Sequence, residues 1–232
     1  MREFYSYLDG VVPRDHSGQA TAPALLERRL KAGFQPKRVL DFGCGNGRSI
    51  DLFARLAPFT EWNGVDIEFS PEVASRTRED GKFFTYDGVN LPFASGEFDL
   101  IYSFQVLEHC RKPEAVLGEI RRCLNKGGLF IGQTSQFEPY HSYSLWNFTV
   151  YGFKVIMEDA GLRILELRPG IDGFTLMRRT YENRPDYLSC FFSSESPVNW
   201  EIEQSLRQQT AKQRNLRKLH FSGHFVWVAE GA

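Results

Sequence analysis

The sequence predicts an α/β protein with a doubly wound, mostly parallel sheet and helices on both faces. Short apolar runs alternate with segments of helical periodicity over most of the 232 residues, an order that favours parallel strands joined by right-handed crossovers. A glycine-rich turn, Gly43–Gly47, joins the first of these runs to the first of these helices. The length suits one domain of this class.

Each element is expected where its periodicity is clearest. Strands are expected where apolar runs are short, at 38–42, 61–66, 83–86, 98–104, 129–134, 162–167 and 224–229. Helices are expected where apolar side chains recur every three or four residues, at 23–31, 47–57, 70–79, 113–124 and 149–160. Ser70-Pro71 marks a helix start, whereas Lys126-Gly127-Gly128 and Gly161 mark helix ends.

The order of elements also predicts how one domain is organised. Residues 1–33 form an N-terminal helical extension, 34–168 a ligand-binding core, and 224–232 the last strand of that core. Residues 169–223 interrupt the alternation and are expected to form an inserted lid or substrate segment, with a polar helix around 198–219.

Composition restricts the class of protein. The net charge is −1, with 42% apolar and 25% charged residues, which argues against a general binder of nucleic acid or anionic membranes. No apolar run approaches the roughly 20 residues that span a bilayer, and the first ten residues lack the apolar segment of an export signal. Four scattered cysteines without a paired spacing indicate reduced, buried thiols. We therefore expect a cytoplasmic protein.

The glycine turn points to a cationic ligand. Its spacing is G-x-G-x-G, and Arg48 stands where a dinucleotide fingerprint would carry its third glycine. Asp41 lies two residues before the first glycine, where its carboxylate would repel a pyrophosphate and favour an ammonium or sulfonium group. S-adenosylmethionine carries both of these cations.

Acids at the ends of the next two strands extend this site. Asp66 ends the second strand about 20 residues after the glycines, a position suited to the two ribose hydroxyls. Asp87 follows the third strand, where its carboxylate can accept from an adenine amino group. Taken singly, Asp66 could instead cap the next helix, and Asp87 could form a turn. Three acids at three neighbouring strand ends favour a cofactor site.

Five segments in order, VLDFGCGNG, GVDI, DGVNLPF, FDLIYSFQVLEH and LNKGGLF, resemble class I S-adenosylmethionine-dependent methyltransferases over residues 39–167. The resemblance is to the small-molecule or glycan-tailoring type. It implies a Rossmann-like sheet of seven strands, the last antiparallel beside the sixth, and S-adenosylhomocysteine as the product. It places Asp41, Gly43 and Gly45 at the methionine end, Asp66 at the ribose, and Asp87 with Gly88 at the adenine. The full cofactor-binding set that it implies is Asp41, Gly43, Cys44, Gly45, Gly47, Asp66, Ile67, Asp87, Gly88, Val89, Ser103 and Gln105.

The acceptor is expected at the same edge of the sheet. A hydroxyl acceptor needs a base, and the candidates are His109 after the fourth strand and Glu138 and His141 after the fifth. Aromatic residues crowd the polar segment 133–149, which suits a sugar or an aromatic acceptor; the same rings could instead pack a lid onto the domain. No cluster of Asp and Asn follows the fourth strand, so no metal ion is expected.

Residues 204–218 carry five basic side chains and no acid. A solvated helix face explains this run most simply, and contact with a phosphorylated carrier or a membrane surface is the functional alternative.

The leading function is methylation of a hydroxyl on a free or carrier-linked sugar, or on a polysaccharide intermediate. Alternatives are C- or O-methylation of a quinone-like or aromatic molecule, and a non-catalytic methyltransferase-like binding module. Nucleic acid is disfavoured because Ser103-Phe104-Gln105-Val106 stands where amino-methylating enzymes carry Asn/Asp-Pro-Pro-aromatic.

Overall fold

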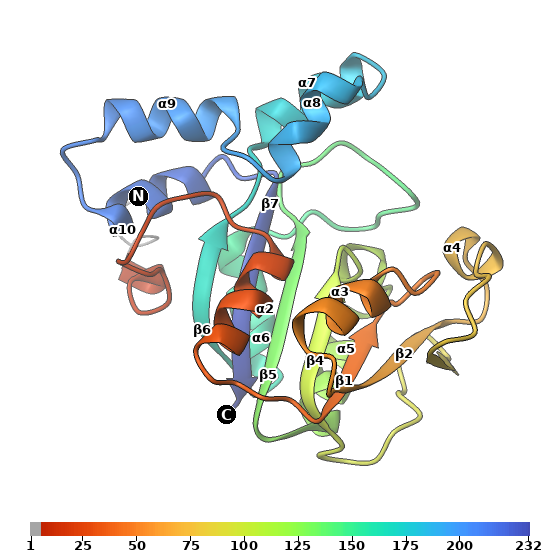
Figure 1. Cartoon of the computed structure of the whole chain (residues 1–232). Helices are drawn as coiled ribbons and strands as arrows, with labels where there is room; N and C mark the ends of the chain where they lie inside the picture. Colours follow the sequence, from red (N-terminus) through yellow and green to blue (C-terminus); the bar gives the residue numbers. More distant parts are fainter. Residues whose placement is uncertain (1–5) are drawn as a thin grey trace.

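A computed structural model describes residues 6–232, and the first five residues of the expected extension 1–33 lie outside the described part. The strands are β1 (Arg38–Phe42), β2 (Glu61–Ile67), β3 (Lys82–Tyr86), β4 (Phe98–Phe104), β5 (Leu124–Ser135), β6 (Leu162–Pro169) and β7 (His224–Gly231). They form one seven-stranded sheet in the order β3-β2-β1-β4-β5-β7-β6 (Figure 1). Strand β7 is antiparallel to both β5 and β6, and the pairs among β1 to β5 are parallel. The predicted fold class is confirmed.

Helices cover both faces of the sheet (Figure 1). The helices of the core are α2 (Ala22–Lys31), α3 (Ser49–Leu56), α4 (Pro71–Ala74), α5 (Pro113–Cys123) and α6 (Val150–Asp159). Helices α2 and α3 bury Leu26 and Phe53 against one face, whereas α5 and α6 bury Ile120 and Phe153 against the other. These two apolar layers fix the sheet and leave the carboxyl ends of its parallel strands as one exposed edge.

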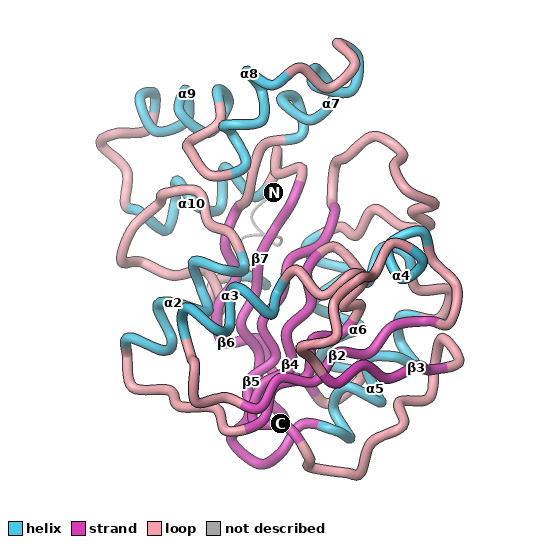
Figure 2. The backbone as a smooth tube through the Cα atoms, turned by 45° about the vertical axis from the view of Figure 1, so that its right-hand side comes forward, coloured by secondary structure: helices cyan, strands magenta, loops and turns pink. Residues whose placement is uncertain are grey.

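The segment between β6 and β7 lies over that edge of the sheet (Figure 2). It contains α7 (Gly173–Tyr181), α8 (Asp186–Ser189), the 3₁₀ turn η2 (Cys190–Phe192), α9 (Pro197–Ser205) and α10 (Ala211–Leu219). The expected single helix around 198–219 is wrong: Thr210 starts α10 with a capping box that it shares with Gln213, and this cap separates α10 from α9.

Two further element boundaries differ from the prediction. Helix α4 ends at Ala74, not at residue 79, because residues 75–81 contain no apolar side chain that a helical face could bury. Strand β5 begins at Leu124, directly after α5 ends, so Lys126–Gly128 lie within an irregular strand start and do not separate helix from strand. One cysteine also differs, since Cys190 is exposed whereas the other three are buried.

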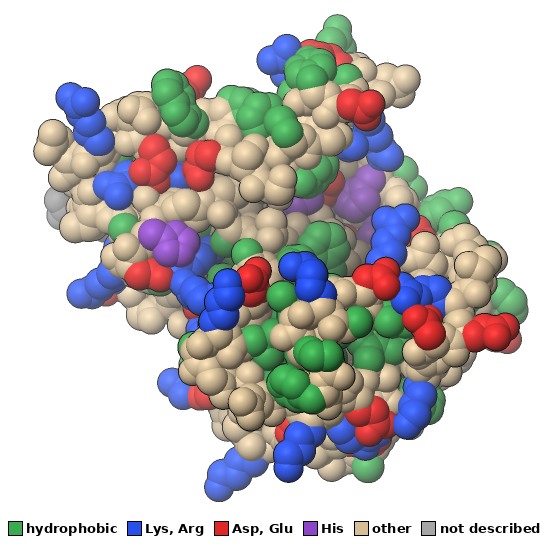
Figure 3. All heavy atoms as spheres, viewed as in Figure 1, with side chains coloured by type: hydrophobic (Ala, Val, Ile, Leu, Met, Phe, Trp, Pro, Cys, Tyr) green, Lys and Arg blue, Asp and Glu red, His purple; other side chains and the backbone are tan. Residues whose placement is uncertain are grey.

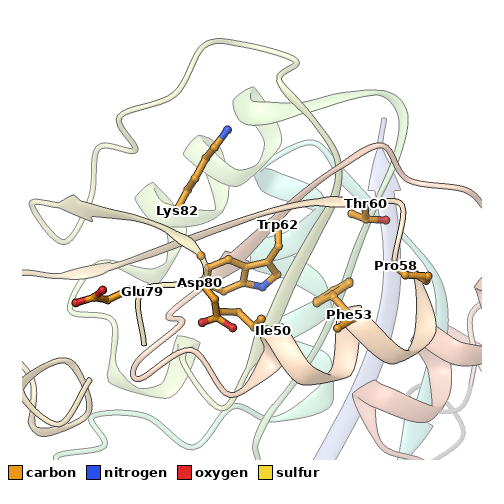
Figure 4. Close-up of a pocket in the computed structure, with 11 residues that line it drawn as sticks. Ile50, Phe53, Pro58, Thr60, Trp62, Glu79, Asp80 and Lys82 are labelled. Atoms are coloured by element: carbon orange, nitrogen blue, oxygen red, sulfur yellow. The ribbon is translucent and has the colours of Figure 1, made fainter. Parts of the chain in front are cut away.

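Because α4 is short, part of the sheet beside it is left without a covering helix. A hollow of about 490 Å³ lies there, lined by α3, the start of β2 and the turn before β3. Figure 4 shows Ile50 and Phe53 on α3 beside the ring of Trp62. This hollow contains none of the acids or histidines predicted to form the cofactor and acceptor site.

Three of the five cations of the basic run 204–218 pack against acids of the protein. Lys218 is fully buried and forms ion pairs with Glu195 and, at 2.7 Å, with Glu203. Arg214 pairs with Glu203 at 2.9 Å, and Lys212 is buried against Asp9. The expected solvated face is therefore wrong for these three cations. Their ion pairs also make them unavailable to a phosphate group or a membrane surface. Within residues 6–232 no helix has the length and apolar character needed to cross a membrane.

Candidate cofactor and acceptor site

The glycine loop follows β1 and is tied to β2. The backbone N–H groups of Gly43 and Cys44 donate to the carbonyl of Val65 at 2.8 and 3.1 Å. Gly43, Gly45 and Gly47 have φ angles of 76°, 50° and 84°, in the left-handed region that favours glycine. A Cβ on Gly43 would lie 2.3 Å from the side chain of Val106. The loop therefore keeps its shape only with glycine at this position.

Asp66, at the end of β2, faces the loop. Its Oδ2 accepts a hydrogen bond from Gly45 N at 2.7 Å, and its Oδ1 accepts one from Ile67 N at 2.7 Å. Burial raises the pKa of this carboxyl despite these two bonds. Asp66 thus lies where the sequence predicted, at the carboxyl edge and in contact with the glycine loop.

Asp41 lies below the loop and is almost fully buried, with 4% exposure. Its Oδ2 accepts from Ser49 Oγ at 2.5 Å, and Ser49 in turn accepts from Trp62 Nε1 at 2.9 Å. Burial raises the pKa of Asp41 to about 7, and the charge of Asp66 contributes to that rise. Two partly uncompensated acids below one backbone loop favour a cationic ligand.

The segment after α4 also contacts the loop, which the sequence did not indicate. The guanidinium of Arg76 donates to the carbonyl of Gly45 at 2.6 and 2.9 Å and lies 4.1 Å from the centroid of the Phe83 ring. Glu72 on α4 comes so close that a Cβ on Gly45 would lie 3.0 Å from it. Residues that were expected to lie in a longer helix therefore contact the glycine loop through polar side chains.

Asp87 lies one strand further out and is exposed. Its Oδ1 accepts from Val89 N at 2.9 Å and from Asn90 N at 2.7 Å, so the acid forms a turn around Gly88. Its hydrogen bonds with Asn90 lower its pKa. The register of β2 and β3 pairs Ile67 with Tyr86, which places Asp87 at the same edge as Asp66.

Ser103 and Gln105 lie where β4 ends, beside the glycine loop. The side chain of Ser103 is buried, and its Oγ has no hydrogen-bond partner within residues 6–232. Gln105 has a φ of 56°, an uncommon backbone conformation for a residue other than glycine that often marks a functional site. Its side-chain amide lies 2.7 Å from His224 Nε2.

A chain of hydrogen bonds leads from α2 to Glu138. Ala22 N donates to Gln133 Oε1 at 3.2 Å, which turns Gln133 Nε2 towards His224 Nδ1 at 3.1 Å. On the other side of the ring, His224 Nε2 lies 2.8 Å from Glu138 Oε2. His224 was not among the predicted residues, although an antiparallel strand after the sixth must begin at this edge.

Glu138 is a partly buried acceptor of several hydrogen bonds. Burial alone would raise its pKa, but the bond and charge of His224 and the bond from Ser135 Oγ at 2.5 Å outweigh that effect and lower it. His141 Nδ1 lies 3.6 Å from the same Oε2. Two of the three predicted bases are therefore neighbours.

His109 lies in the 3₁₀ turn η1 (Leu107–His109), and its ring meets that of His141 edge to face, with centroids 5.4 Å apart. Glu108 beside it is fully buried and accepts from Thr134 Oγ1 at 2.7 Å, and Ser135 Oγ, which donates to Glu138, lies 3.3 Å from its Oε1. Ligand atoms of Glu108, His109 and His141 lie within 4.8 Å of one another. Figure 3 shows histidine side chains in a recess below α7 and α8.

Exposed aromatic side chains surround these polar groups. Phe137 of the 136–149 loop contacts Phe174 of α7, with ring centroids 6.3 Å apart, so loop and insertion meet at the site. The large exposed apolar residues of this rim are Phe104, Phe137, Tyr140, Tyr143, Leu145, Trp146 and Phe174. Trp146 is anchored by a bond from Nε1 to the carbonyl of Cys110 at 2.8 Å. A polar floor under an apolar rim suits a small molecule with both kinds of surface.

Residues 14–167 match the family model of a methyltransferase domain. A malonyl-[acyl-carrier protein] O-methyltransferase of Legionella pneumophila is 30% identical over 47% of this chain and 40% of the relative. A ubiquinone biosynthesis O-methyltransferase of Nitrosococcus oceani is 28% identical over 59% of this chain and 56% of the relative. The matches thus span about half the length of these curated relatives.

Solved structures share the fold. The [4+2]-cyclase SpnF superposes with a TM-score of 0.60 at 18% identity, over 99% of this chain and 92% of the cyclase. A 1,6-didemethyltoxoflavin-N1-methyltransferase of Burkholderia thailandensis, solved with S-adenosylhomocysteine, superposes with a TM-score of 0.54 at 18% identity, over 91% of this chain and 76% of that one. A cyclase and a methyltransferase on one fold show that the reaction must be inferred from the site.

Proposed function

The chain belongs to the methyltransferase domain family, class I, with S-adenosylmethionine as cofactor, and on that premise we propose that it methylates a hydroxyl oxygen of a small molecule, specifically of a sugar or polysaccharide intermediate. The observation that carries this proposal is the partly buried carboxylate of Glu138, held by His224 and Ser135 at the carboxyl edge of the sheet. A fixed carboxylate is a base for a hydroxyl proton.

The cofactor assignments follow from the order of the strand ends. The methionine end lies over the glycine loop, above the negative charge of Asp41. The ribose hydroxyls bind Asp66, and the adenine lies beside Asp87 and Gly88. Support comes from the bond between Gly45 N and Asp66, which brings the loop and this acid into contact, and from the raised pKa values of Asp41 and Asp66, which a cation would lower again.

The reaction is a direct displacement. The acceptor hydroxyl gives its proton to the carboxylate of Glu138, and its oxygen attacks the methyl carbon. The bond between carbon and sulfur breaks with its electron pair going to sulfur, which yields S-adenosylhomocysteine. Alignment of oxygen, carbon and sulfur supplies much of the rate enhancement, and residues 169–223 act as a lid that helps to align the acceptor. The contact between Phe137 and Phe174 supports this role.

The rim favours a sugar because rings stack on the apolar face of a pyranose while the polar floor binds its hydroxyls. A second acceptor class, an aromatic or quinone-like hydroxyl, is favoured by the ubiquinone biosynthesis O-methyltransferase among the relatives. A carboxyl on a carrier protein is suggested in the same way by the malonyl-[acyl-carrier protein] relative. All three present an oxygen nucleophile.

The test is an acceptor panel with S-adenosylmethionine, read as S-adenosylhomocysteine release and as acceptor mass. The panel holds nucleotide-linked sugars, lipid-linked sugars, hydroxyquinols and a malonylated carrier protein. Methylation of a sugar supports the proposal, whereas methylation of another class alone overturns the sugar assignment. Glu138→Gln should bind the cofactor normally and lose roughly 100- to 10,000-fold in turnover. Glu114→Gln, an exposed change on α5, is the control. Cofactor binding with no product from any acceptor would favour the non-catalytic module.

A further inference from the structure

Glu108, His109 and His141 form the one side-chain group within residues 6–232 whose ligand atoms converge as a metal site would require. We propose that these three residues bind a divalent transition-metal ion, of the class of Zn²⁺, beside the acceptor pocket. Two imidazoles and a carboxylate are a common ligand set for such ions and leave coordination positions open. The proposed function does not include this ion.

The protonation of His109 supports the proposal. Its ring is bonded to the backbone carbonyl of Tyr143, whereas its Nδ1 is buried with no hydrogen-bond partner in the described part of the chain. The N–H that donates to the Tyr143 carbonyl is therefore at Nε2, and in the neutral ring the lone pair lies on Nδ1. A buried lone pair without a partner is costly unless a ligand satisfies it. A metal-bound histidine typically donates its other N–H to a backbone carbonyl in this way.

His141 shows the corresponding pattern with a carboxylate. Its Nδ1 lies 3.4 Å from the carbonyl of Pro139 and 3.6 Å from Glu138 Oε2, and both of these oxygens accept. The proton is thus placed on Nδ1, which leaves Nε2 as the lone pair available to a metal. Glu138 would then hold His141 from behind, as carboxylates hold metal-bound histidines in known centres.

Glu108 supplies the charge. It is fully buried, and neither its hydrogen-bond partners nor the charges around it include a lysine or arginine among the described residues. The bond from the Thr134 hydroxyl orients the carboxylate but brings no positive charge. A buried carboxylate of this kind is costly, and a divalent cation would compensate it.

The inference deepens the proposed function, since an open coordination position would bind the acceptor oxygen and lower the pKa of its hydroxyl. It does not depend on that function, because metal binding can be measured without an acceptor. Nitrogen ligands disfavour Mg²⁺, which prefers oxygen.

The experiment uses the full chain after chelator treatment and dialysis. Zn²⁺ is titrated by calorimetry, and Co²⁺ is followed by its visible absorption, which reports nitrogen ligation. We expect one ion per chain. His141→Ala and His109→Ala should each weaken Zn²⁺ binding by about 100-fold, and Glu138→Gln by roughly 10-fold. His220→Ala, a histidine at the end of α10, should bind as the unchanged chain does.

Binding of S-adenosylhomocysteine by each variant shows that it is folded. Absence of one-to-one Zn²⁺ or Co²⁺ binding in a chain that binds S-adenosylhomocysteine would overturn the metal site and leave the proposed methyl transfer standing. Equal Zn²⁺ affinity in His141→Ala would also overturn it. One-to-one binding lost in both histidine variants would support the site even if no acceptor were methylated.

Discussion

The carboxylate of Asp66 accepts a hydrogen bond from the backbone N–H of Gly45 over 2.7 Å, so the end of β2 and the loop after β1 form one surface. If the ribose binds there, Asp66→Ala removes the acceptor of the ribose hydroxyls and also the hydrogen bond that holds Gly45 of the loop. Cofactor affinity should fall by roughly 1–3 kcal/mol, or about 5- to 150-fold, because polar partners are left unpaired. Calorimetric titration with S-adenosylhomocysteine measures this directly.

Asp87→Ala is the comparison, because that carboxylate is exposed and its bonds are local to its turn. Its loss should weaken the cofactor by less than the loss of Asp66. Equal affinity of Asp66→Ala and the unchanged chain would remove the ribose assignment.

The buried acid Asp41 predicts how cofactor binding depends on pH. Its pKa is raised to about 7, mainly by burial. The ionised form attracts the cationic cofactor, so affinity should rise as pH increases from 6 to 8. The stability of the free protein should change in the opposite direction. Because the folded state holds this proton to a higher pH than the unfolded state, the free energy of unfolding should fall as pH rises from about 4 to 7.

Asp41→Asn should flatten both dependences, and titrations with S-adenosylmethionine together with urea denaturation at three pH values measure them. Asp51→Asn, an exposed acid on α3, should keep the dependence of the unchanged chain. A variant at Asp41 that retained the full dependence of affinity on pH would assign it to another group.

Alanine substitutions at two glycines distinguish the cost of backbone strain from the cost of steric crowding. Gly43 and Gly88 have φ angles of 76° and 92°, but only Gly43 has a side chain, Val106, where a Cβ would lie. Gly88→Ala should cost about 1–2 kcal/mol of unfolding free energy from backbone strain alone. Gly43→Ala should cost about 1–3 kcal/mol more from overpacking, and it should also weaken the cofactor.

Chemical denaturation of both variants checks the order of these costs. Adding Val106→Ala to Gly43→Ala should remove the part of the loss in unfolding free energy that comes from crowding, whereas the part from backbone strain should remain. Equal stability of the two single variants would show that Val106 moves aside freely.

Much of the fold followed from local patterns in the sequence. Every strand of the sheet was located, because short apolar runs bounded by turns determine buried strands. Helix α4 was overextended because Ser70-Pro71 is a strong start signal, whereas its end depends on the absence of apolar residues in 75–81 and on the bonds of Arg76 to the loop. Tertiary contacts of this kind leave little trace in periodicity.

The candidate site was predictable where residues follow strand ends and unpredictable where they meet across the fold. Asp41, Asp66 and Asp87 could be placed from the strand order alone. Glu108 and His224 could not, because their roles depend on which side chains face them: Thr134 and Ser135 for Glu108, Glu138 and Gln133 for His224. The start of an antiparallel last strand was the one available signal for His224.

The buried cation of α10 gives the last prediction, a test of what the basic run 204–218 does. Lys218 is fully buried between Glu195 and Glu203 and also donates to the carbonyl of Ser17 at 2.6 Å, which ties the N-terminal segment to the insertion. Lys218→Ala would leave Glu195 without its cation and Glu203 with Arg214 alone, and breaking a fully buried pair typically costs 3–5 kcal/mol. Because both carboxylates are partly exposed, we expect about 2–3 kcal/mol.

Arg217 is the matched control, since it precedes Lys218 on the same helix, carries the same charge and is exposed. Arg217→Ala should change the free energy of unfolding by less than about 0.5 kcal/mol, as surface changes usually do. Urea denaturation of the two variants distinguishes a structural role of the basic run from a role in binding. The m-value shows whether only stability has changed. If the run instead served a phosphorylated carrier or a membrane surface, Lys218→Ala and Arg217→Ala would be equally stable and would both lose binding to anionic vesicles.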